Sequence, residues 1–183
     1  MVIYMSNKSI EFKINYKKAI EVILYILNKY KNEGVNMYNL IKIIFAADKY
    51  HLNKYARPVT GDCYIKMQYG TVPSTICDYL KFDDLALPFI GEKEYPFSKS
   101  EKGHNFYPTR ACNESLLSES DIEAIEHGIQ EYHGLSFDEV KNKNHDEKCW
   151  VNACLNNVIP FELMIDDKNI LEYLKENSSN MVI

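Results

Sequence analysis

Two short segments of the sequence carry residue types that could do chemistry. The first places Asp48 three residues before His51, and the second runs from His145 through two acidic residues to Trp150. A carboxylate near an imidazole can serve as a general acid or base, and His, Asp and Glu also bind metal ions. Both segments therefore have to be weighed as parts of a hydrolase active site.

A structural role explains the first segment better. Asp48 falls on the apolar stripe of its expected helix, where an unpaired buried carboxylate would be costly. We therefore expect Asp48 to be buried and to accept hydrogen bonds from the turn at residues 57–62. As a catalytic pair, Asp48 and His51 would need a nucleophile or metal nearby, and the local sequence offers only Cys63 and Tyr64.

The second segment also has a simpler interpretation. His145 or Asp146 can cap a helix, and Trp150, the only tryptophan, suits a core anchor. The second His of an HExxH zinc motif is missing from the segment. The five cysteines are scattered without a CxxC pair, so we expect no catalytic metal and no cofactor.

Composition narrows the functional classes. The 183 residues are 46% hydrophobic, which suffices for one globular domain, and the net charge of −5 disfavours non-specific nucleic-acid binding. The sequence has no apolar run of membrane-spanning length and no signal-peptide pattern, so we expect a cytoplasmic protein with reduced thiols. Fourteen tyrosines are unusual; Tyr is frequent at protein interfaces, although an AT-rich genome would also favour it.

Apolar periodicity and capping residues define the helices that must position these side chains. In the second expected helix, Asn36 is the candidate N-cap and Arg57–Pro58 forces the end. Its apolar stripe is at Ile41, Phe45, Leu52 and Tyr55. Two capping boxes, Ser118–Asp121 and Ser136–Glu139, mark later helix starts. The expected helices, by approximate range, are 16–34, 37–55, 74–84, 119–134, one that begins after Ser136, and 167–176.

Extended structure is expected in two places. Residues 63–69 alternate apolar and polar side chains as a strand does, and residues 70–73 read as a tight turn. Residues 95–97 and 104–107 could pair as a hairpin. The expected fold is α+β and mainly helical, with helices packed around the 63–69 segment. We divide the chain into an N-terminal lead-in (1–15), a single domain (16–176) and a disordered tail (177–183).

Several motifs follow one another along the chain: residues 40–52, 57–62, 69–74, 117–119 and 135–136, then His145 and Trp150. Their order resembles the SocA-like antitoxin family, also called the Panacea domain. The similarity runs from about Ala19 to Ala153, and one departure is Thr71, where the family usually has Pro. We expect most of the motif positions to be structural. They are Asp48, His51, Pro58, Thr60, Gly61, Asp62, Tyr69, Gly70, Pro73, Ser74, His145 and Trp150.

The resemblance implies an antitoxin, not an enzyme, that binds and neutralises a protein toxin encoded by an adjacent gene. The family is often associated with phages and mobile elements. Its founding member also delivers its toxin to a protease as an adaptor, so a protease is a further candidate partner, although no residue here points to that activity. No membrane partner is expected.

Two other functions remain open at the level of sequence. A small hydrolase could use Asp48 with His51, or His145. A DNA-binding autorepressor is the third candidate, but the acidic charge and the lack of a basic recognition helix weigh against nucleic acid as a partner. A small toxin-like neighbouring gene would favour the antitoxin.

Overall fold

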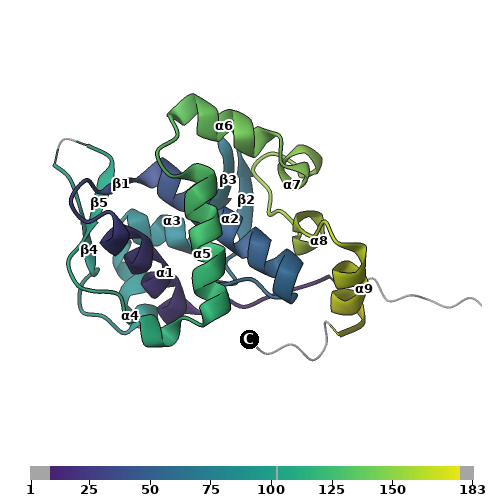
Figure 1. The fold of residues 1–183 in the computed structure, drawn as a ribbon, viewed down its shortest axis with the longest axis horizontal. Coiled ribbons are helices and arrows are strands. Elements are labelled where there is room, and N and C mark those ends of the chain that lie inside the picture. The colour runs from purple at the N-terminus through teal and green to yellow at the C-terminus, as the bar shows by residue number, and fades with distance from the viewer. Residues whose placement is uncertain (1–8, 102, 178–183) are drawn as a thin grey trace, which may run out of the picture.

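The computed structural model describes residues 9–101 and 103–177, which form the expected mainly helical α+β fold (Figure 1). The helices are α1 (Tyr16–Lys29), α2 (Met37–Tyr55), α3 (Ser74–Leu80), α4 (Leu87–Ile90), α5 (Glu119–Tyr132), α6 (Phe137–His145), α7 (Lys148–Asn152), α8 (Phe161–Met164) and α9 (Lys168–Asn177). The strands are β1 (Val35–Asn36), β2 (Tyr64–Met67), β3 (Gly70–Pro73), β4 (Phe97–Lys99) and β5 (Asn105–Pro108). Short 3-10 turns, η1 (Asp84–Ala86) and η2 (Glu114–Leu116), complete the secondary structure.

Helix α2 lies at the centre of the packing. Residues 40–48 are buried without a break, so this part of the helix is covered on all sides and not along one stripe. Tyr55, at the end of the helix, is exposed. Asn36 caps it as expected, accepting a hydrogen bond from the Tyr38 N–H at 2.8 Å. In Figure 1, α5 lies across α2, with α1 on one side, α6 at the top and α7 to α9 on the other side.

The hydrophobic core has two parts that share α2. The larger part joins α1, α3, α5 and the β4–β5 hairpin to residues such as Ile43 and Ile44 of α2. The smaller part surrounds Phe45 and Leu52 with Tyr64 and side chains from α7, α8 and α9. Since both parts use the same helix, α2 ties the two ends of the chain together.

The prediction of a tight turn at residues 70–73 is wrong. These residues form β3, which pairs antiparallel with β2 in the register Lys66 to Thr71, and the tight turn lies at residues 68–69. Pro73 is accommodated because it ends the strand, where its missing N–H costs little. The second expected hairpin is confirmed as β4 and β5, and β1 extends it on the other side of β5.

The predicted capping boxes are confirmed, whereas the helix start near His145 is placed differently. Ser118 with Asp121 caps α5, and Ser136 with Glu139 caps α6. His145 ends α6, and the next helix, α7, has Glu147 at its N-cap position without a side-chain cap. The short helices α4 and α8 are additions that sequence periodicity did not predict, because four residues are too few to show a helical period.

The chain ends can be described in part. Residues 1–8 of the expected lead-in and 178–183 of the expected tail lie outside the described residues. Ile10 is buried in the smaller core, and Asn177, expected in the tail, is the last residue of α9. Within the described chain, none of the helices combines the length and apolar character needed to cross a membrane.

Candidate functional site

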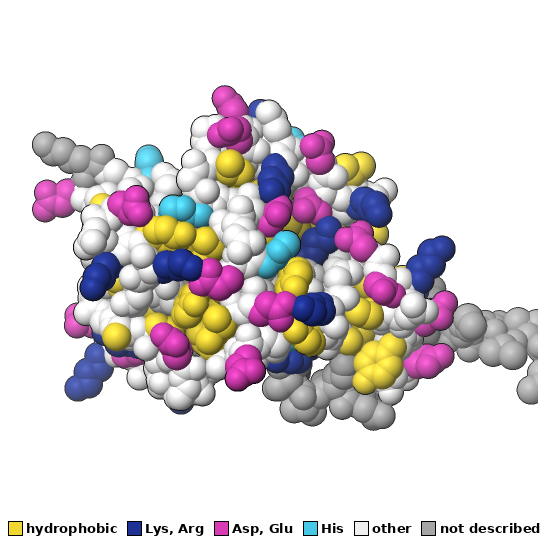
Figure 2. Space-filling model, in the orientation of Figure 1, with side chains coloured by type: hydrophobic (Ala, Val, Ile, Leu, Met, Phe, Trp, Pro, Cys, Tyr) yellow, Lys and Arg dark blue, Asp and Glu magenta, His cyan; other side chains and the backbone are white. Residues whose placement is uncertain are grey.

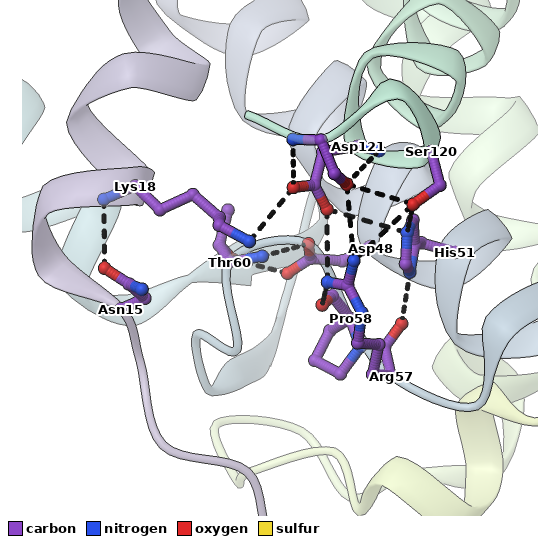
Figure 3. Close-up of polar contacts among 10 residues, drawn as sticks. Asn15, Lys18, Asp48, His51, Arg57, Pro58, Thr60, Ser120 and Asp121 are labelled. Atoms are coloured by element: carbon purple, nitrogen blue, oxygen red, sulfur yellow. Dashed lines mark hydrogen bonds and ion pairs between the residues drawn. The ribbon is translucent and has the colours of Figure 1, made fainter. Parts of the chain in front are cut away.

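Asp48 is at the centre of a buried junction between α2 and the turn that follows it (Figure 3). Its carboxylate is fully buried and accepts hydrogen bonds from the Thr60 N–H at 2.8 Å, the Thr60 hydroxyl and the Tyr64 hydroxyl at 2.9 Å. Burial raises the pKa of Asp48 to about 6, although these hydrogen bonds act to lower it. The expected burial and partners of Asp48 are confirmed.

The next motif residues join this turn to α3. Asp62 is buried and accepts hydrogen bonds from the N–H groups of Thr75 at 3.1 Å and Ile76 at 2.9 Å, so it satisfies the start of α3 from outside the helix. Gly61 has φ +73°, and a Cβ there would lie 2.5 Å from the Lys13 carbonyl oxygen. Three further motif residues belong to the same region. Pro58 is buried, and Pro73 ends β3. The Ser74 N–H donates to the Cys63 carbonyl at 2.8 Å.

His51 does not pair with Asp48, and its two ring nitrogens have other partners. Nδ1 lies 2.7 Å from the Arg57 carbonyl oxygen and therefore carries the proton, because a carbonyl only accepts. Nε2 lies 3.0 Å from the Ser120 hydroxyl and accepts a hydrogen bond from it. Burial lowers the pKa of His51, which favours this neutral form.

The Ser120–His51 contact has the distance of a nucleophile and its base. A catalytic triad also needs a carboxylate on Nδ1 of the histidine, and here the Arg57 carbonyl occupies that nitrogen. Asp121 lies on the Nε2 side instead, with Oδ1 3.5 Å from that atom. The arrangement therefore lacks the order of groups that orients a triad.

Asp121 fastens α5 to the rest of the junction. Its buried carboxylate pairs with Lys18 of α1 at 3.0 Å and with Arg57 at 3.1 Å, and accepts from the Ser118 N–H at 2.9 Å. Burial alone would raise the pKa of Asp121, but the hydrogen bonds from Ser118 and Lys18 lower it. Sequence reasoning found the capping box but missed Lys18 and Ser120, because nothing local links α1 to α5.

A second group of motif residues holds the turn between β2 and β3. Three consecutive backbone carbonyls at this hairpin tip, those of residues 67–69, accept hydrogen bonds from aromatic side chains. Trp150 Nε1 donates to Met67 at 3.1 Å, His145 Nε2 lies 3.0 Å from the Gln68 oxygen, and the Tyr38 hydroxyl donates to Tyr69. The tip is thereby fixed from α7, α6 and α2 at once.

Trp150 is half-buried, so the expectation of a core anchor is wrong. It stacks on His145 with ring centroids 3.8 Å apart, and Lys66 Nζ lies 4.2 Å from its centroid on the hairpin side. Cys149, the preceding residue, takes the buried position. The polar N–H of the indole reaches the hairpin because the ring lies at the surface of α7.

A buried lysine completes this region and was also missed from the sequence. Lys42 is fully buried and donates to the Thr71 carbonyl, while Asn144 Oδ1 accepts from the Thr71 N–H at 2.6 Å. Gly70, at φ +115°, leaves the space they need, since a Cβ there would lie 2.3 Å from Asn144 Oδ1. One charged residue inside the apolar run 40–47 was the available sequence signal.

Lys42 gives a testable pH dependence. Burial lowers its pKa to about 7, against an opposite effect of Cys77. In the unfolded chain the lysine titrates near pH 10.4, so between about pH 7 and 10.4 the unfolded state binds more protons and stability rises with pH. We expect Lys42→Met to remove this rise. Urea unfolding of both proteins at several pH values measures it, and parallel curves would contradict the assignment.

Across residues 9–101 and 103–177, no three His, Cys, Asp or Glu side chains are grouped so that they could hold a metal ion.

One family model matches the sequence. The model for the antitoxin SocA-like, Panacea domain, covers residues 40–151, more than half of the chain. The chain belongs to the SocA-like antitoxin family. No curated protein and no solved structure matches it significantly.

The Panacea domain match runs from α2 to α7 and includes both groups of motif residues described above. Helices α1, α8 and α9 lie outside the matched span yet pack into the same two-part core around α2. We therefore propose that residues 16–176, together with Asn177 at the end of α9, form one domain in this member of the family.

Proposed function

We propose that this SocA-like antitoxin neutralises a protein toxin, encoded by an adjacent gene, by binding to it directly in the cytoplasm. The observation that carries the proposal is membership of the antitoxin family. The internal contacts of the motif residues Asp48 and Asp62 support it, because both hold helices and turns in place, as does Asp121 of the α5 capping box. These three carboxylates are buried and bonded within the chain, so they are not available to react with a substrate.

Charge favours a basic protein partner. The net charge of −5 steers association with a positively charged molecule such as a toxin that acts on RNA or ribosomes. Acidic and basic side chains are interleaved on the face drawn in Figure 2, which does not resemble the basic stripe of a DNA-binding surface. An acidic protein surface of mixed charge fits a protein complex better than an operator-binding role.

Co-expression tests the proposal. The product of the adjacent gene should arrest growth alone, and the chain should restore growth and co-purify with that product. The chain without a toxin partner should have no effect. Restored growth without any complex would contradict neutralisation by binding.

The Ser120–His51 contact supports a second candidate, a hydrolase that reverses the toxin's damage. Ser120→Ala separates the two functions, since it removes the nucleophile and leaves the Asp121 ion pairs in place. We expect the variant to rescue growth as the wild-type chain does. Loss of rescue in a variant that still binds the toxin would favour the hydrolase.

A further inference from the structure

A hollow of about 720 Å³ opens beside the hairpin tip, between the start of α2 and the connection from α5 to α6. Its apolar walls include Met37, Ile41, Leu135 and Phe137. Among the described residues that line it there is no Asp, Glu, Lys or Arg, and the lining includes the titratable side chain of His104. A hollow lined mainly by apolar and neutral side chains accommodates apolar groups and disfavours charged ones.

Aromatic side chains form a ridge next to this hollow. Phe137 stacks on Tyr38 with centroids 4.6 Å apart, and Tyr69 meets its edge at 5.5 Å. Phe137 is 49% exposed and Tyr69 is 48% exposed, so large apolar surfaces of both rings face solvent. Contiguous exposed aromatic surface beside a hollow is typical of protein-binding sites.

Hydrogen bonds hold the hairpin tip that carries Tyr69. The carbonyls of Met67, Gln68 and Tyr69 are all bound by Trp150, His145 and Tyr38, as described above. A surface that is ordered before binding loses little conformational freedom when a partner arrives. The motif residues His145 and Trp150 thus act as positioning residues for the exposed Tyr69 ring.

The charge at the edge of the surface indicates the chemistry of the partner. Asp138 and Glu139 are exposed in the first turn of α6, directly after Phe137. Asp138 lies close enough to Tyr38 to contribute, after burial, to raising the pKa of that phenol to about 12. A partner that fills the hollow would therefore meet negative charge at this rim.

We propose that the toxin-binding surface consists of the hairpin tip at residues 67–69, Phe137 and the adjoining hollow. This inference rests on the proposed function and specifies its interface. The hollow takes apolar side chains of a toxin segment, and Lys or Arg residues flanking that segment face Asp138 and Glu139. The toxin is held by a preformed aromatic ridge with acidic residues at its edge.

Alanine substitutions with matched controls test the surface. Tyr69→Ala and Phe137→Ala should each weaken binding to the co-expressed product of the adjacent gene about tenfold or more. The controls are Tyr173→Ala and Phe89→Ala, which change rings that are 55% and 60% exposed on α9 and α4. The controls should stay within about threefold of wild type. Binding is measured by titration with purified proteins, after thermal melting has shown that each variant folds.

A charge reversal tests the flanking contacts without touching the ridge. Asp138→Lys, at an exposed position, should weaken the complex and reduce the salt dependence of its association rate. If the wild-type chain binds the toxin and Tyr69→Ala and Phe137→Ala bind it equally tightly, this inference is wrong and the proposed function is unaffected. The absence of any wild-type complex would overturn the proposed function with it. A dimer of this chain that these substitutions dissociate would assign the surface to a second copy instead.

Discussion

Gly128→Ala is expected to destabilise the protein by roughly 3 kcal/mol, against the normal preference of helices for alanine. Gly128 lies in the middle of α5, where that helix crosses α2. A Cβ at this position would lie 2.2 Å from the Ile43 carbonyl oxygen and 3.2 Å from the Ala47 nitrogen. These are backbone atoms of the buried central helix, so they cannot move aside as the end of a side chain could.

Urea unfolding measures this effect. Gln130→Ala is the matched control, because it changes an exposed residue of the same helix and should alter stability little. Propensity alone would make Gly128→Ala stabilising by up to about 1 kcal/mol, so even the sign is informative. A Gly128→Ala protein as stable as wild type would mean that α2 and α5 are farther apart than described.

Asp48→Ala should cost roughly 3 kcal/mol, because it strands several buried donors at once. The Thr60 N–H, the Thr60 hydroxyl and the Tyr64 hydroxyl all lose their acceptor. Asp48→Asn is the matched control: its amide oxygen can still accept from the Thr60 N–H, so we expect a smaller loss. Thermal and urea unfolding compare the two. An Asp48→Ala protein that melts normally yet fails to neutralise the toxin would make Asp48 a functional residue.

A comparison of wild type with Asp48→Asn also tests the protonation of the Asp48 carboxylate. The folded pKa of Asp48, about 6, is above the value near 3.9 of an unfolded aspartate. The folded state therefore binds more protons between these values, and the contribution of this group to stability is lost as pH rises through about 6. Asp48→Asn should lack this contribution, so the stability difference between wild type and variant should change across that window. A constant difference from pH 4 to 7 would contradict the burial of an ionisable group.

Local signals predicted much of the fold. The bounds of α2 followed from Asn36 as its cap and from Arg57–Pro58 beyond its end, and two capping boxes located the starts of α5 and α6. Strand β3 was missed because Gly and Pro at its ends are also turn residues, and only pairing with β2 distinguishes the two. A pairing partner is not visible in a short window of sequence.

The site was less predictable than the fold. The environment of Asp48 could be anticipated, because an acid on an apolar helix face must find donors close by. The contacts between Lys18 and Asp121, and between Trp150 and Met67, join residues far apart in the chain, so no spacing rule could place them. The exposed ridge at Tyr69 and Phe137 likewise exists only once the hairpin and α6 are brought together.

A titration of purified toxin with this chain, read out as the toxin's own activity, tests the central claim most directly. Neutralisation by binding predicts that activity falls in proportion to the chain added, ends at a fixed ratio of chain to toxin, and returns when dilution dissociates the complex. Complete silencing by a small fraction of the chain, persisting after the chain is removed, would show enzymatic action and contradict the account.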